Sequence, residues 1–327
     1  MTKPRRTLTR LAAVVAVFAV VVGACARSGG ASNAPAASAG ASQAAGAKGT
    51  VNIAINPWVG YEADGAVIGY LLENKLGYKV NKKTLNEQVS WEGFPTGEVD
   101  VILENWGHDD LAKKYIEQDK VAADAGPTGN KGIIGWYVPP WLATAHPDIL
   151  DWNNLNKYAD NFKTSESGGK GQLLDGDPSY VTNDEALVKN LNLNFEVVYA
   201  GSEAALIEAF KTAEAQKKWV IGYFYEPQWL FSQLKLQRVK LPPYTAGCDA
   251  DPKKVSCDYP EYNLNKVVSK KFADTGGDAY TLIKKFSWTN DDQNVVAGYI
   301  TNQGMTPEQA GKKWVDENEA KWQAWMP

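Results

Sequence analysis

From residue 50 onward, short apolar runs alternate with segments of helical length, and this alternation limits the possible folds more than any other feature. The apolar runs lie at 51–55, 99–103, 132–138, 172–174, 195–200 and 219–225, with amphipathic stretches between them such as 63–75, 111–118, 183–190 and 202–216. Strands separated by helices form βαβ crossovers, which build parallel sheets with helices on both faces. The alternation therefore predicts an α/β protein.

The part of the chain after residue 50 is too long for one comfortable hydrophobic core, so we expect two lobes. No Gly/Ser-rich linker interrupts it, and the Pro-Pro pairs at 139–140 and 242–243 are the candidate boundaries. They predict a discontinuous lobe I (50–140 and 243–327) and a lobe II (141–242), joined by a two-strand hinge that permits closure around a ligand. Near the end of the chain, the capping box from Thr306 to Gln309 predicts the start of a helix.

The first 50 residues have the features of an export signal followed by a tether. Basic residues at 3–10 precede an apolar run at 11–22, which is too short to cross a membrane core of about 30 Å. The sequence from Val22 to Cys25 resembles the lipobox of bacterial lipoproteins, in which the cysteine receives a lipid. We expect a signal peptide at 1–24, a lipidated Cys25 and a flexible Ala/Gly/Ser-rich tether at 25–49. The alternative is an ordinary signal peptide with a chance cysteine.

This amino terminus predicts an extracytoplasmic protein, held by its lipid at the outer face of the cell membrane or in the periplasm. The two other cysteines, Cys248 and Cys257, fit that location, because a disulfide is the usual state of cysteine pairs outside the cytoplasm. Their spacing is not the C-x-x-C of redox enzymes. We therefore expect a structural disulfide that closes a small loop.

Several function classes are disfavoured by composition and by missing motifs. The formal net charge is −4, and all 38 acidic residues follow residue 50, which argues against a nucleic-acid binder. Two histidines and three cysteines leave little material for a metal or redox site, so we expect no metal and no cofactor. The sequence has no G-x-S-x-G elbow and no Walker motif. We expect a protein that is not an enzyme.

Aromatic residues follow four of the predicted strands, at the edge where open α/β sheets bind ligands. Trp58 and Trp106 follow the runs at 51–55 and 99–103, Tyr180 follows that at 172–174, and Tyr225 ends the run at 219–225. Each ring face attracts a cation by about 0.5–2 kcal/mol. A single ring in such a position is more often hydrophobic core. Four rings in equivalent positions favour a cage for a quaternary ammonium group, which has no N–H to donate to a carboxylate.

Four stretches carry a resemblance to a known family: NPWVGYEAD, VDVILENWGHDD, DGDPSYVTND and GYFYEPQWL. They resemble the glycine betaine (osmoprotectant) binding proteins of ABC importers, and the resemblance covers the chain from about Val51 to Pro327. It implies a type II periplasmic-binding fold whose two lobes close on a betaine in an aromatic cage. It also implies a monomeric protein that delivers a small quaternary amine to an ABC permease with its ATPase subunit.

The resemblance further implies which residues bind the ligand. Trp106 matches a cage tryptophan directly, Tyr180 and Tyr225 stand where relatives commonly have tryptophan, and Trp58 is expected as a fourth wall. The cage would therefore be a mixed Trp/Tyr cage.

In the family, backbone N–H groups after the second cage residue bind the ligand carboxylate, and here these belong to Val181 and Thr182. They precede a predicted helix, where free N–H groups favour an anion. His108 is a further candidate donor, although some relatives place a histidine four rather than two residues after the tryptophan. The alternative for His108 is a solvated residue before a helix cap.

Two alternative functions stay open. Choline has a hydroxyl in place of a carboxylate, and its binding proteins use an acidic side chain near the cage, for which Glu62, Asp64 and Glu104 are candidates. A choline-specific protein of the same fold is therefore one alternative. A receptor or adhesin lipoprotein that takes no part in transport is the other.

Overall fold

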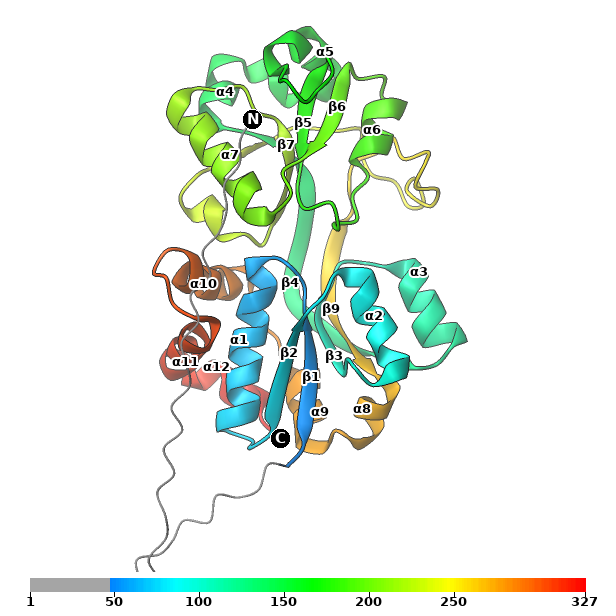
Figure 1. The fold of residues 1–327 in the computed structure, drawn as a ribbon, viewed down its shortest axis with the longest axis vertical. Helices are drawn as coiled ribbons and strands as arrows, with labels where there is room; N and C mark the ends of the chain where they lie inside the picture. Colours follow the sequence, from blue (N-terminus) through cyan, green and yellow to red (C-terminus); the bar gives the residue numbers. More distant parts are fainter. Residues whose placement is uncertain (1–47) are drawn as a thin grey trace, which may run out of the picture. The chain divides into compact units, whose positions relative to one another are not determined.

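The computed structural model describes residues 48–327, and these form a single mixed sheet covered by helices (Figure 1). The strands are β1 (Thr50–Ile55), β2 (Lys79–Thr84), β3 (Val101–Asn105), β4 (Ala122–Val138), β5 (Gly171–Asp175), β6 (Phe195–Tyr199), β7 (Gly222–Glu226), β8 (Gln237–Arg238) and β9 (Glu261–Ser269). Their order in the sheet is β2-β1-β3-β9-β4-β7-β5-β6, and β8 pairs with β4. The predicted α/β class is confirmed.

The α-helices are α1 (Val59–Asn74), α2 (Glu87–Thr96), α3 (Asp109–Ala112), α4 (Pro140–Ala145), α5 (Leu155–Tyr158), α6 (Asp184–Asn190), α7 (Glu203–Gln216), α8 (Lys270–Thr275), α9 (Gly277–Lys285), α10 (Asn290–Thr301), α11 (Pro307–Glu317) and α12 (Glu319–Trp322). A π-helical segment, Lys113–Gln118, continues α3. Short 3-10 helices lie at Pro147–Leu150, Trp152–Asn154, Ala159–Phe162, Trp229–Ser232 and Gln323–Trp325.

The sheet is parallel at its two sides and antiparallel in its middle. Strands β2, β1 and β3 pair in parallel at one side, and β6, β5 and β7 do so at the other. In the middle, β4 pairs antiparallel with both β9 and β7, and β3 pairs antiparallel with β9. The alternation of apolar runs and helical segments predicted only the parallel strand pairing at the two sides of the sheet. The antiparallel centre arises because the long strands β4 and β9 run side by side between the two groups of elements (Figure 1).

Local sequence accounts for the starts of several helices. The predicted capping box is present at α11: the Gln309 N–H donates to the Thr306 hydroxyl, and the Thr306 N–H donates to the Gln309 side chain. At α7, the Ser202 hydroxyl accepts from the Ala205 N–H at 3.2 Å. Such caps each stabilise a helix by about 1 kcal/mol. They therefore fix the entries of two helices that the sequence also predicts.

The predicted disulfide between Cys248 and Cys257 is present. Its loop is attached to α6, because the Asn190 side-chain amide donates to the carbonyl groups of Lys253 (3.1 Å) and Val255 (2.8 Å). The predicted signal peptide (1–24), Cys25 and nearly all of the tether (25–49) lie outside the described residues. Within residues 48–327, no helix is both long enough and apolar enough to span a membrane.

Candidate functional site

A cavity of about 230 Å³ is lined by every residue that the sequence analysis assigns to the aromatic cage and the carboxylate site. The predicted residues in its lining are Trp58, Trp106, His108, Tyr180, Val181, Thr182 and Tyr225. The remaining lining residues are Glu87, Gly107, Asp110, Ile134, Asn183, Tyr223, Asp249, Pro252 and Tyr262. Pockets for drug-sized ligands are commonly about 300–1,000 Å³, so this one suits a smaller molecule.

The four predicted rings stand edge to face around the cavity. Trp58 and Tyr180 have ring centroids 5.7 Å apart with planes at 86°, and Trp106 and Tyr225 are 5.8 Å apart at 84°. Tyr180 also meets Tyr225 at 6.4 Å and 87°. Perpendicular neighbours present walls of different orientation, which is the arrangement of the aromatic cages that bind quaternary ammonium groups.

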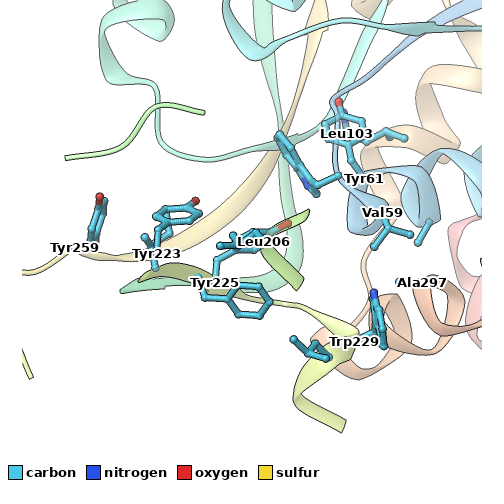
Figure 2. Packing of buried hydrophobic residues seen from close by; sticks show 14 of the residues in the cluster. Val59, Tyr61, Leu103, Leu206, Tyr223, Tyr225, Trp229, Tyr259 and Ala297 are labelled. Carbon is cyan, nitrogen blue, oxygen red and sulfur yellow. The ribbon is translucent and has the colours of Figure 1, made fainter. Parts of the chain in front are cut away.

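Two more tyrosines, which the sequence analysis did not select, extend this set of rings. Tyr223 lies two residues before Tyr225 on β7 (Figure 2), and the period of two in a strand puts both side chains on one face. Tyr262 comes from β9, and its ring centroid lies 5.9 Å from that of Trp106. The spacing of two on a predicted strand was a usable signal for Tyr223. Nothing in the local sequence marks Tyr262, because β9 reaches the cavity through its pairing with β3 and β4.

Two glycines, Gly107 and Gly132, set the position of Trp106. Gly107, the next residue, has φ of +78°, a conformation that favours glycine and turns the chain sharply after the strand. On β4, a Cβ at Gly132 would lie 2.6 Å from the Trp106 ring. The indole thus lies directly against the β4 backbone, and it also lines the cavity.

The cavity lining includes two residues, Val181 and Thr182, whose backbone N–H groups have no acceptor within residues 48–327. The flanking N–H groups of Tyr180 and Asn183 are bonded, to the Asp177 carbonyl (2.9 Å) and the Tyr259 hydroxyl (2.6 Å). Within the described part of the chain, the N–H groups of Val181 and Thr182 have no such partner. Two free N–H donors in a cavity wall suit an anionic oxygen.

His108 lies in the cavity wall beside a buried acid that the sequence analysis missed. Its Nε2 is hydrogen-bonded to the Glu87 carboxylate, and both side chains are buried. Burial lowers the pKa of His108, but the hydrogen bond and charge of Glu87, with the charges of Asp110 and Asp109, outweigh it and leave the pKa raised. A protonated His108 adds positive charge to the cavity wall.

Glu203 connects a cage ring to the start of α1. Its carboxylate accepts hydrogen bonds from the Tyr225 hydroxyl (2.5 Å), the Gln228 side chain (2.6 Å) and the Val59 N–H (2.9 Å). Burial raises the pKa of Glu203 to about 7, although the bonds from Tyr225 and Val59 oppose the shift. A second link joins the same regions, since the Tyr180 hydroxyl donates to the carbonyl of residue 57 at 3.2 Å.

The acids considered for a choline hydroxyl are placed elsewhere. Glu62, Asp64 and Glu104 are absent from the lining formed by the described residues. Asp64 and Glu104 are buried, and Glu104 lies behind the cage, where it accepts hydrogen bonds from both tryptophans. The acids that do line the cavity are Glu87, Asp110 and Asp249, of which Asp249 comes from the disulfide loop.

Comparison with known proteins gives one family-model match and several relatives. Residues 49–317 match the family model OpuAC, described as the substrate binding domain of ABC-type glycine betaine transport system. The trimethylamine N-oxide-binding protein of Pelagibacter ubique is 28% identical over 303 residues, which is 87% of this chain and 93% of that protein. The glycine betaine/carnitine transport binding protein GbuC of Listeria monocytogenes is 27% identical over 124 residues, 38% of this chain and 37% of that protein.

Solved structures share the fold. Lactococcal OpuAC, in its closed-liganded conformation with glycine betaine, superposes with a TM-score of 0.67 at 22% identity, covering 86% of this chain and all of that one (100%). An ABC-transporter choline binding protein in complex with choline gives 0.68 at 20% identity, covering 84% and 91%. These likenesses confirm the predicted two-lobed periplasmic-binding-protein fold.

Proposed function

We propose a ligand for this chain, which belongs to the family of substrate binding domains of ABC-type glycine betaine transport systems. Its cavity binds glycine betaine or a closely related quaternary ammonium osmoprotectant. The observation that carries the proposal is the pairing of two features in one cavity. Aromatic rings line it, and so do Val181 and Thr182, whose backbone N–H groups have no acceptor within the described residues. A trimethylammonium group fits the first feature and a carboxylate fits the second.

The energetics permit this binding. Each ring contributes about 0.5–2 kcal/mol to a desolvated cation, and each hydrogen bond to a charged group contributes about 1.5–3 kcal/mol. These gains must offset the loss of translational and side-chain freedom on association. A net of about −7 to −8 kcal/mol corresponds to a micromolar dissociation constant.

We further propose that the ligand is enclosed by two lobes, with boundaries near residues 140 and 243 and with β4 and β9 as the strands that pass between them. The contacts from Glu203 to Val59 and from Tyr180 to residue 57 would then join lobe II to lobe I in the closed state. The protein performs no chemistry, acts as a monomer and presents its ligand to an ABC permease. Its lipid anchor at Cys25 is part of this proposal.

Choline is the second candidate, and the charge of the cavity supports it. Three carboxylates line the wall (Glu87, Asp110 and Asp249), and among the described lining residues the cationic side chains are limited to His108, which is paired with Glu87. An acidic wall favours a ligand with net positive charge. Trimethylamine N-oxide, which a relative is named for binding, has the same trimethylated nitrogen and belongs in the same test.

The test is a thermal-shift series with glycine betaine, glycine betaine methyl ester, choline and trimethylamine N-oxide. Ligand that binds only the folded state adds about 4 kcal/mol of stability at a thousandfold excess over Kd. The ester keeps the trimethylammonium group and loses the carboxylate charge. A shift with betaine and a much smaller one with the ester supports the carboxylate site. A shift with choline alone favours the second candidate, and no shift with any of them refutes the proposal.

A further inference from the structure

Glu104 joins the two tryptophans of the cage from behind. It lies on β3 and is 2% exposed. A single oxygen, Oε1, accepts the indole N–H of Trp106 at 2.7 Å and that of Trp58 at 3.2 Å. The two rings come from different elements, so this shared acceptor fixes them relative to each other.

The second carboxylate oxygen of Glu104 is also bonded. Oε2 accepts from the side-chain amide of Gln293, on α10, at 2.7 Å. Gln293 is itself fixed by Asn130, whose amide donates to it at 2.5 Å. The buried carboxylate thus receives three N–H donors. Burial raises the pKa of Glu104, and these hydrogen bonds oppose that rise by stabilising the ionised form.

Asp64 shows the opposite situation next to Glu104. It is 1% exposed, and neither of its oxygens has a hydrogen-bond partner in the part of the chain that the structure describes. Burial, followed by the charge of Glu104, raises the pKa of Asp64 well above its usual range. Two neighbouring buried carboxyls share one charge. Because Glu104 accepts three N–H hydrogen bonds, we assign the shared charge to Glu104 and infer that Asp64 is its neutral partner.

We propose that Glu104 is the positioning residue of the cage, which orients Trp58 and Trp106 through their indole N–H groups and supplies a negative charge behind them. This inference rests on the proposed function, since it assigns the charge to the recognition of a quaternary ammonium group. A charge bonded to the cage rings from behind, in a buried position, attracts a cation and leaves a neutral ligand unaffected.

The test uses E104Q, because its amide oxygen still accepts the indole N–H groups while the charge is removed. The matched control is D64N, the same carboxyl-to-amide change in the same buried pair at the residue that is already neutral. The probes are tetramethylammonium, which has no carboxylate or hydroxyl, and 3,3-dimethyl-1-butanol, a neutral alcohol in which a tert-butyl group stands in place of a trimethylammonium group. Calorimetric titration gives the affinities, and melting temperatures without ligand report folding.

We expect E104Q to bind tetramethylammonium about tenfold more weakly, D64N to stay within about twofold of wild type, and the neutral alcohol to bind all three proteins alike. Equal losses in E104Q and D64N, or equal losses for the cation and the alcohol, would overturn the assignment. If E104Q does not fold, E104D takes its place. It keeps the charge but withdraws the carboxylate from both indoles, so both probes should weaken, and wild-type affinities would refute the orienting role.

The same experiment separates this inference from the proposed function. A wild-type protein that binds neither glycine betaine nor tetramethylammonium refutes the function and the inference together. A wild-type protein that binds both, with E104Q unchanged, refutes the role of Glu104 alone.

Discussion

The backbone N–H of Val59 donates a 2.9 Å hydrogen bond to the carboxylate of Glu203, although the two residues lie 144 positions apart in the chain. Val59 begins α1 and Glu203 begins α7, so the bond ties the starts of two helices together. Because the same carboxylate accepts from Tyr225, a change in its protonation reaches both this link and the cage.

Glu203 should make stability fall as pH rises through the weakly acidic range. Its pKa is about 7 in the folded protein, above the ordinary 4.5. Between these values the unfolded chain has released the proton and the folded protein retains it, so the free energy of unfolding declines with rising pH, by about 3 kcal/mol over the window. E203Q should flatten this slope in urea unfolding from pH 4.5 to 8. The control E208Q changes an exposed residue of the same helix and should keep the wild-type slope.

Trp106→Ala should weaken betaine binding by at least about tenfold, since it removes one cage wall. The matched control is Trp141→Ala, which changes a half-buried tryptophan on α4 that packs on Trp219 and should leave the affinity near wild type. Isothermal titration measures both variants, with melting temperatures as the check on folding. Unchanged affinity in a folded Trp106→Ala protein would mean that the cage assignment is wrong.

Removing the disulfide should lower both stability and ligand affinity. The bond closes a short loop and stabilises the fold by about 2–3 kcal/mol. That loop also places Asp249 and Pro252 in the cavity wall. The double variant Cys248→Ser, Cys257→Ser should therefore melt earlier and bind more weakly. Asn190→Ala, which removes the attachment of the loop to α6 but keeps the disulfide, separates loop placement from covalent closure: a normal affinity in both variants would exclude the loop from the binding site.

His108 should make the preference for a carboxylate ligand depend on pH. Its pKa lies above the ordinary value, so its positive charge is present at lower pH and is lost as pH rises through that raised pKa. We expect the affinity ratio of glycine betaine to tetramethylammonium to increase as pH falls, and to be flatter in H108N. Taking the ratio removes effects that act on both ligands alike. The same slope in wild type and H108N would show that His108 does not sense the carboxylate.

The parallel parts of the fold were predictable because their strands are apolar. The runs at 51–55, 99–103 and 195–200 match β1, β3 and β6 within about two residues. Strand β2, with the sequence KVNKKT, was missed because it is a polar edge strand. Strand β9 was missed as well, and so was the first half of β4, where Gly126, Pro127 and Gly129 interrupt any strand pattern. These two strands form through their long mutual pairing, which local sequence does not reveal.

The residues of the candidate site divide in the same way, into those that local sequence marks and those that only tertiary contacts bring to the cavity. Rings that directly follow a predicted strand, such as Trp106, were found from position and resemblance. Residues brought in by tertiary contacts were not: Glu87 reaches the cavity from α2, and Tyr262 reaches it from β9. Glu104 was selected for its charge, but its place behind the tryptophans depends on how β3 meets α1, which only the folded chain defines.

Two tyrosines of the cage wall lie on one face of β7 because side chains alternate between the two faces of a strand. Tyr223 and Tyr225 face the cavity, while Phe224 between them packs against Phe210 on the other side. A one-residue insertion or deletion in β7 would exchange these faces, placing a phenylalanine in the cavity and tyrosine hydroxyls in the core. Evolution can therefore tune this wall by exchanging one ring for another, but a change in strand length would remove both tyrosines from the site at once.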